Sequence, residues 1–389
     1  MRKVFRKMCR QILRSRRIVV IFILGILVNM PSAAEDTESD EFTVKLEEIR
    51  KERGLPALAA AAIRHGELVL NAATGVRKLG SDEEVMTDDL WHLGSCTKSM
   101  TATLAGMLVD EGRLSWSTTI GEIFPDLQGS MRQSWHNVTL EQLLTHRSGA
   151  PDHPPVDLWA EALEQKGTPT EQRFAIMHGT VCQPPQEPHG KKFIYSNEGY
   201  AIAGAMIERV TGSSWEDLLR ERLFEPLGMT SAGFGAPAAQ GKVNQPWGHL
   251  GEIGELRPVP PGPMADSPPA IGPAATVHAS LADFARYADW HADWKRAEPR
   301  LLTEETFNHL HHSPPGQEYA CGWLVQERDW AGGEVLWHTG SNAMFYAVMW
   351  VAPEREATFV AATNAAHSEA DDACNDAVVA MIRRVLGKY

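Results

Sequence analysis

The chain of 389 residues is long enough for one large domain or two modest ones. With 43% hydrophobic and 22% charged residues it has the composition of an ordinary globular protein, which excludes a disordered or fibrous chain. Its formal net charge of −13 argues against nucleic acid or an anionic membrane surface as a partner, because both would repel it.

The start of the chain has the three parts of a secretory signal. Residues 2–17 hold eight lysines or arginines and no acid, residues 18–28 are continuously apolar, and small residues follow at 31–34. The apolar run is too short to span a bilayer comfortably. We therefore expect residues 1–34 to be a cleaved signal peptide. The remaining chain, 35–389, would be exported to the periplasm or the medium without stable membrane insertion, with a formal charge of −21.

The cysteines that remain after cleavage are widely scattered and form neither a C-x-x-C pair nor a zinc-ligand spacing. Cys96 directly follows a candidate nucleophile on a packed helix, where we expect a buried free thiol. We predict no disulfide framework and no metal or other cofactor, and we leave a single disulfide open because export would permit one.

The predicted elements of the first part of the chain are a helix at 42–53 and two strands at 57–64 and 67–74. Only His65 and Gly66 separate the strands, which is the length of a hairpin turn. Apolar residues then recur with helical spacing beyond Ser95, and predict a helix that ends at Gly112.

The middle of the chain is predicted to be mostly helical, with a capping box at Thr139 and a helix over 200–210. Residues 235–275 are rich in proline and glycine and lack periodicity, and long connections of this kind often line a binding cleft. A further helix starts after Ser280. The C-terminal third is predicted to form strands at 319–326, 334–338, 344–351 and 357–362, followed by a helix at 371–386.

This order of elements predicts an α+β fold. An antiparallel sheet formed by both ends of the chain would be flanked by helices and would carry a mainly helical inserted subdomain. We expect the sheet subdomain at about 42–113 and 276–389, and the helical and loop subdomain at about 114–275.

Ser95 and Lys98 form a Ser-x-x-Lys pair at the start of the predicted helix, one turn apart on the same side. A serine hydroxyl is a poor nucleophile until a neighbouring base takes its proton. A lysine becomes such a base if burial or the helix dipole lowers its pKa. A helix-capping serine followed by a solvated lysine is the alternative, so the pair needs partners elsewhere in the chain.

Two further segments supply those partners. Tyr195 precedes a helix in the sequence Tyr-Ser-Asn, where a tyrosine can relay a proton and the amide of Asn197 can orient Lys98 or a substrate carbonyl. His338 begins the sequence His-Thr-Gly at the end of an apolar strand. Gly340 would let a substrate backbone approach the strand edge, and the N–H of Ser341 could donate to an oxyanion. Taken singly, the two segments could equally be a loop cap and a strand-end turn.

The three motifs, in this order, resemble the serine β-lactamase and penicillin-binding-protein superfamily. They are most similar to its class C-related branch of esterases, D-amino-acid peptidases and lactamase-like proteins. The stretches 143–149 and 224–229 support the resemblance, which covers residues 42–387.

The resemblance implies a cofactor-free serine hydrolase that acts through an acyl-enzyme. Ser95 would attack a carbonyl, while Lys98 and Tyr195 would share the acid and base work in an order that stays open. Asn197, His338, Gly340 and Ser341 would bind the substrate, with the N–H groups of Ser95 and Ser341 as the oxyanion hole.

One departure from the family pattern concerns His338, where typical lactamases carry lysine. A histidine is mostly neutral above about pH 6.5, so we expect small esters or D-amino-acid peptides and amides to be preferred over β-lactams. We also expect binding of anionic substrates to improve on acidification. A β-lactamase or DD-carboxypeptidase-type penicillin-binding activity, or a non-catalytic binding protein on the same fold, is the alternative. The oligomeric state, including a polymerising scaffold, is left open.

Overall fold

The computed structural model describes residues 33–387, and contacts divide the chain into two units between Glu38 and Ser39. The features below belong to the second unit. The signal peptide predicted at 1–34 lies outside the described residues except for its last two, so it stays a prediction, as does the division into subdomains. No helix among the described residues is both long and apolar enough to cross a membrane.

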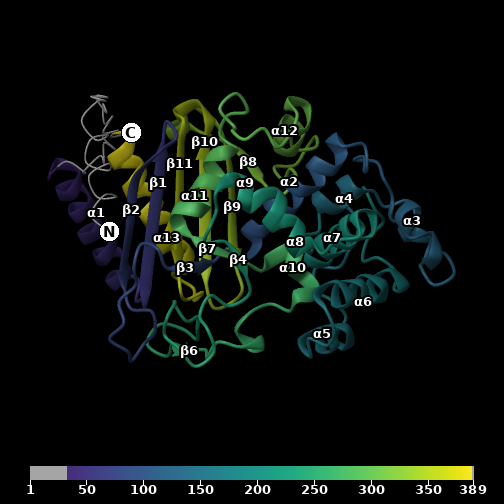
Figure 1. Cartoon of the computed structure of the whole chain (residues 1–389), viewed down its shortest axis with the longest axis horizontal. Helices are drawn as coiled ribbons and strands as arrows, with labels where there is room; N and C mark the ends of the chain where they lie inside the picture. Colours follow the sequence, from purple (N-terminus) through teal and green to yellow (C-terminus); the bar gives the residue numbers. More distant parts are fainter. Residues whose placement is uncertain (1–32, 388–389) are drawn as a thin grey trace, which may run out of the picture. The chain divides into compact units, whose positions relative to one another are not determined.

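A six-stranded antiparallel sheet draws on both ends of the chain (Figure 1). Its strand order is β2-β1-β11-β10-β9-β8, so the N-terminal hairpin pairs with the C-terminal strands through β1 and β11. The predicted α+β class and the closure of the sheet by both chain ends are therefore confirmed. The strands are β1 (Ala57–Arg64), β2 (Glu67–Gly75), β8 (Leu324–Arg328), β9 (Gly333–Ser341), β10 (Tyr346–Ala352) and β11 (Ala357–Thr363).

Both faces of this sheet are covered, which explains why β1 is apolar throughout. Alternate residues of a strand point to opposite faces, and Ala59 and Ala61 join one core cluster while Ala60 and Ala62 join another. Helix α11 (Leu281–Trp290) packs on the first face, and α13 (Ala370–Val385) packs on the second, together with the part of α1 (Ala33–Glu52) that begins at Phe42. The small alanines let helices approach the central strands closely.

The segment between the two halves of the sheet is largely helical. Its central pair is α2 (Thr97–Asp110) and α7 (Asn197–Thr211), both almost entirely buried. Thr139 makes the predicted capping box. The other elements are α3 (Ile120–Ile123), α4 (Leu140–Leu144), α5 (Val156–Leu163), α6 (Pro169–Cys182), α8 (Trp215–Leu219), α9 (Glu225–Leu227), α10 (Gly272–Ala275) and α12 (Glu304–His311), with the short strands β3 (Leu90–His92), β4 (Gly233–Phe234), β5 (His249–Leu250), β6 (Arg257–Pro258) and β7 (Val277–Ser280).

The starts of two predicted elements differ by five residues or more from the structure. The first helix begins at Ala33 rather than at residue 42. The strand predicted at 319–326 begins only at Leu324, because Gly322 has a positive φ of +80° and the N–H of Ala320 bonds back to the carbonyl of Trp323. This turn brings Gly322 against the backbone of Ser99 on α2, where a side chain would not fit.

Candidate active site

Ser95 lies in a single 3₁₀ turn, Gly94–Cys96, directly before α2. The end of β9 packs against this turn backbone to backbone. A Cβ atom on Gly94 would lie 2.3 Å from the nitrogen of Ser341, and one on Gly340 would lie 2.0 Å from the oxygen of Leu93. Glycine at both positions is thus a steric requirement for bringing the backbone N–H groups of Ser95 and Ser341 to the same place.

Lys98 is fully buried, and its Nζ atom has three polar neighbours. It lies 3.0 Å from Ser95 Oγ, 2.8 Å from Asn197 Oδ1 and 3.0 Å from the carbonyl oxygen of Ala274. The two carbonyl-type oxygens only accept hydrogen bonds, so they engage two N–H bonds of the amine. In a neutral amine, the lone pair is then left for the Ser95 hydroxyl. We call these four residues the lysine cluster.

Burial lowers the pKa of Lys98 to about 7, because a charged ammonium is poorly solvated inside the protein. The carboxyl of Glu198 acts in the opposite direction and raises this pKa. Near neutral pH, a large fraction of Lys98 is therefore uncharged and able to accept a proton.

Tyr195 lies beside Lys98, with its ring centroid 4.7 Å from Nζ. Its side chain is 36% exposed, so it borders solvent as well as the lysine cluster. Desolvation raises the pKa of Tyr195 above its usual value of 10, although interaction with the Ser95 side chain partly opposes this. The tyrosine therefore keeps its proton at neutral pH. Asn197 follows as the first residue of α7, which Ser196 caps by accepting a hydrogen bond from the N–H of Gly199.

His338 is buried in β9 and belongs to a cluster of rings that we call the aromatic cluster: Phe193, Tyr195, Tyr319, His146 and His338. Its Nδ1 lies 2.5 Å from the carbonyl oxygen of Thr339. Since a carbonyl only accepts, Nδ1 carries the proton and Nε2 accepts a hydrogen bond from the hydroxyl of Tyr319 at 3.0 Å.

The predicted acid switch at His338 is wrong. Burial, together with the nearby charge of Lys98, lowers the pKa of His338 to about 3. The imidazole therefore stays neutral over the whole range from pH 5.5 to 8, and it acquires no positive charge that could attract an anion on mild acidification.

His146 lies at the centre of the aromatic cluster, on the loop after α4. Its ring centroid is 4.3 Å from that of Tyr195 and 4.7 Å from that of Tyr319, and its Nδ1 accepts a hydrogen bond from the N–H of Ser196. Burial holds the pKa of His146 well below its usual range. Its φ of +57° is rare for a residue with a side chain. The loop is therefore strained at His146, and this conformation places the neutral ring in contact with Tyr195.

The structure brings together every residue predicted from the three motifs, and it adds four that sequence reasoning did not assign. These are His146, Glu198, Ala274 and Tyr319. His146 sits in the stretch 143–149 that supported the resemblance, so a signal for it was present. Ala274 contributes only a backbone oxygen, which no side-chain pattern reveals.

The cysteines of the described part of the chain are all free thiols, and Cys96 is buried as predicted. Burial raises the pKa of the Cys96 thiol, so it is not an activated nucleophile. Within residues 33–387, no group of three or more histidines, cysteines or acids is placed to hold a metal ion.

Comparisons with known proteins agree with this geometry. The chain is 29% identical over 321 residues to penicillin-binding protein 4 of Amycolatopsis lactamdurans, covering 79% of this chain and 81% of the relative. It is also 29% identical over 196 residues to lovastatin esterase of Penicillium rubens, covering 46% of this chain and 48% of that enzyme.

Among solved structures, the D-amino acid amidase of Ochrobactrum anthropi SV3 superposes with a TM-score of 0.71 at 20% identity, covering 90% of this chain and 99% of the amidase. At this identity the likeness shows the shared fold. The model of the Beta-lactamase family matches residues 42–381, which is most of the chain. The protein therefore belongs to the beta-lactamase family of serine hydrolases.

Proposed function

We propose that the protein hydrolyses small esters or D-amino-acid peptides and amides, with Ser95 as the acylated nucleophile. The observation that carries this proposal is the 3.0 Å approach of Ser95 Oγ to a buried lysine whose pKa is about 7. A base with a pKa near the operating pH combines a sufficient neutral fraction with a useful proton affinity.

The geometry supports an order of proton transfers. Neutral Lys98 would take the proton of Ser95 during attack, because its lone pair faces that hydroxyl. Tyr195 keeps its own proton at neutral pH and borders solvent, so it would donate to the leaving group. Water would then complete the turnover by the reverse transfers.

The two N–H groups of Ser95 and Ser341 would stabilise the tetrahedral intermediate. Backbone donors held by rigid packing require no reorganisation as negative charge develops on the carbonyl oxygen. The glycines at 94 and 340 supply that rigidity through their direct contact with the opposite backbone.

A preference for neutral substrates follows from His338. A neutral ring that already pairs with Tyr319 offers no fixed positive charge to a substrate carboxylate. Esters and amides without a required carboxylate are therefore favoured over penicillin-like anions. The names of two relatives, an esterase and an amidase, are in keeping with this preference.

The first experiment is the intact mass of the wild-type and Ser95→Ala proteins after exposure to a fluorophosphonate. We expect one adduct on the wild type and none on the variant. Rates on p-nitrophenyl acetate, a D-alanine p-nitroanilide and a chromogenic cephalosporin then rank the substrates. No adduct on either protein would favour a binding protein on the same fold, and fastest turnover of the cephalosporin would favour a β-lactamase.

A further inference from the structure

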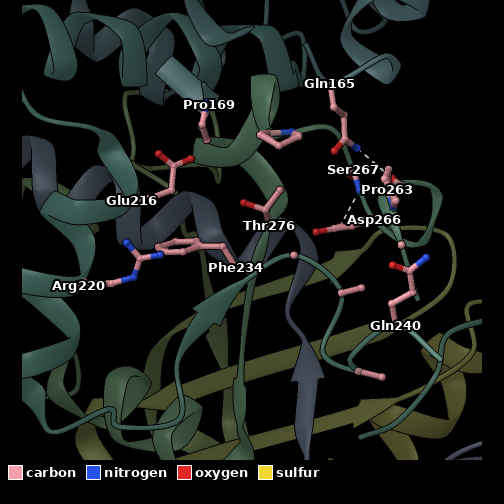
Figure 2. A pocket seen from close by; sticks show the side chains of 15 residues that line it. Gln165, Pro169, Glu216, Arg220, Phe234, Gln240, Pro263, Asp266, Ser267 and Thr276 are labelled. Carbon is pink, nitrogen blue, oxygen red and sulfur yellow. Dashed lines mark hydrogen bonds between the residues drawn. The ribbon is translucent and has the colours of Figure 1, made fainter. Parts of the chain in front are cut away.

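Asp266 lies on the long connection between β4 and α10, beside a cavity of about 440 Å³ (Figure 2). Its side chain is only 7% exposed, and its Oδ2 atom is buried. Burying a carboxylate is costly unless the protein supplies donors or positive charge to it. The contacts of the other oxygen, Oδ1, therefore indicate what this carboxylate does in the fold.

Three nitrogen atoms from different segments meet Oδ1 of Asp266. The N–H of Ser267 donates at 2.6 Å, as the dashed line in Figure 2 shows. The side-chain amide of Asn342, directly after β9, donates at 3.3 Å, and Nε2 of His92, at the end of β3, lies 2.6 Å away. One oxygen thus joins the long connection to β3 and to the turn after β9.

His92 connects Asp266 to the turn that carries Ser95. Its side chain is fully buried, and its Nδ1 accepts a hydrogen bond from the N–H of Gly94 at 3.1 Å. Since a backbone N–H only donates, Nδ1 holds the lone pair and Nε2 holds the proton, next to the carboxylate of Asp266. The carboxylate thus favours the tautomer that binds Gly94, the first residue of the 94–96 turn. We call this turn the nucleophile turn.

Asn342 connects Asp266 to the other side of the proposed oxyanion hole. It directly follows Ser341, and its Oδ1 atom accepts hydrogen bonds from the N–H groups of Met344 at 3.1 Å and Phe345 at 3.0 Å. Those two donors fix the orientation of the amide, so its NH₂ group is the one that faces Asp266. The turn that ends β9 is therefore held both by its own backbone and by Asp266.

We propose that Asp266 is a positioning residue for the oxyanion hole. It holds the nucleophile turn through His92 and the end of β9 through Asn342, so that the N–H groups of Ser95 and Ser341 point to one place. Preorganised donors stabilise an oxyanion only when they are correctly aimed, and a displacement of about 1 Å can cost about 10²-fold in rate. The effect on catalysis rests on the proposed function, whereas the linkage between the segments does not.

The first test applies single-turnover stopped-flow kinetics with p-nitrophenyl acetate to the full chain carrying Asp266→Ala. These kinetics separate the acylation rate from the affinity of the noncovalent complex. We expect the acylation rate to fall about tenfold or more. The affinity should change less than about twofold, because the oxyanion-hole donors act on charge that develops in the transition state. A residue that only stabilised the fold would not produce this split.

A second variant breaks the same linkage from the other side. Asn342→Asp keeps the oxygen that accepts from Met344 and Phe345, but it replaces the amide donor with a carboxylate oxygen that Asp266 repels. Acylation should slow in this variant as well. The double variant with Asp266→Ala should be no slower than Asp266→Ala alone, because both changes remove one contact. If Asp266→Ala does not fold, Asn342→Asp alone decides the outcome.

Hydrogen exchange of the backbone amides tests the linkage without catalysis. In Asp266→Ala, segments 92–97 and 341–345 should exchange at least about tenfold faster relative to the rest of the sheet. The matched control is Asp283→Ala. Asp283 is also buried, at 6% exposure, but its Oδ2 accepts from the N–H of Ser231 at 2.8 Å. Its loss should leave both segments and the acylation rate unchanged.

Equal acylation rates in the wild type and Asp266→Ala, a loss confined to affinity, or multiplied effects in the double variant would overturn the proposal. Exchange that rises equally in Asp266→Ala and Asp283→Ala would also overturn it. If the wild type releases no p-nitrophenol, the proposed function fails, and the exchange data alone decide whether Asp266 holds the two segments.

Discussion

The lysine cluster and the aromatic cluster touch where Lys98 meets the ring of Tyr195, yet burial has different consequences for the titratable side chain of each cluster. Lys98 meets three polar atoms and has a pKa of about 7. His338 meets one hydroxyl and one carbonyl among rings, and its pKa falls to about 3. Burial is the main cause of both shifts.

The difference shows how one buried site can separate its functions. The pKa of an exposed lysine is high, so burial lowers it to near 7, where the side chain can both accept and release a proton at neutral pH. The pKa of an exposed histidine is already near neutral, so the same burial lowers it until the side chain stays uncharged at all physiological pH values. The lysine cluster therefore supplies proton transfer, and the aromatic cluster supplies neutral, fixed packing around Tyr195.

The largest expected effect comes from Lys98→Met, which preserves the length of the side chain and removes the base. We expect the rate of acylation to fall at least about 10³-fold, because the variant has no amine beside Ser95 Oγ to take the proton of the hydroxyl. Stopped-flow labelling with a fluorophosphonate measures it. Lys191→Met, at an exposed position, is the control, and a residual rate within tenfold of wild type would show that Lys98 is not the base.

The next prediction tests the contact between the nucleophile turn and the end of β9, which brings the N–H groups of Ser95 and Ser341 together. Gly340→Ala introduces a Cβ atom 2.0 Å from the oxygen of Leu93 and must push β9 away from the nucleophile turn. We expect kcat to fall about 10²-fold, as for the loss of an oxyanion donor. Gly129→Ala, where a Cβ atom meets nothing within 4 Å, should leave kcat unchanged. Comparable kcat values in the two variants would contradict the assignment of Ser341.

Tyr319→Phe probes the aromatic cluster by removing the donor to His338 Nε2. The buried acceptor would then be unmatched, and we expect the free energy of unfolding to fall by about 1 to 3 kcal/mol. Urea denaturation measures this change. Tyr346→Phe removes a hydroxyl that bonds Asp371 nearer the surface and should cost less. If the order of the two variants were reversed, the hydrogen-bond assignment at His338 would be wrong.

The smallest effect concerns the pH profile. Glu198 is buried, burial raises its pKa to about 7, and its charge raises the pKa of Lys98. In Glu198→Gln the pKa of Lys98 falls wherever the wild-type carboxyl is ionised, so more of the lysine is neutral near pH 7. We expect kcat/KM at pH 7 to increase by up to about twofold relative to its plateau, with little change at pH 6, where Glu198 is mostly protonated and uncharged. A rise in the wild-type rate through about pH 7 provides the reference, and a shift toward alkaline pH would contradict the sign.

The strands that carry alternating or continuous apolar residues could be predicted from the sequence. The hairpin at 57–64 and 67–74 matches β1 and β2 within a residue, because a two-residue turn fixes the register. The start of β8 could not be predicted. Apolar residues continue through the turn at Gly322, and only contact with α2 reveals that the chain bends there.

The motifs likewise predicted which side chains meet, but not what surrounds them. Ser95, Lys98 and Asn197 were expected together, and Ser95 Oγ and Asn197 Oδ1 each lie within 3.0 Å of Lys98 Nζ. His338 was expected to be neutral near pH 7, but its failure to titrate on mild acidification was not foreseen, because its pKa is lowered by burial and by the charge of Lys98, which lies far away in the sequence. The protonation state of His338 depends on residues from several parts of the chain, so it cannot be predicted from the local sequence of β9.

The contact between the nucleophile turn and β9 also bears on how the protein is made. A ribosome completes Ser95 and Lys98 long before it reaches Gly340 and Ser341, near the C-terminal end of the chain. Until β9 docks, a growing chain has a nucleophile and a base but lacks the second oxyanion donor. Under the proposed mechanism, the protein becomes an active hydrolase only when both ends of the chain have joined in one sheet. Incomplete chains would therefore not cleave the esters and peptides around them.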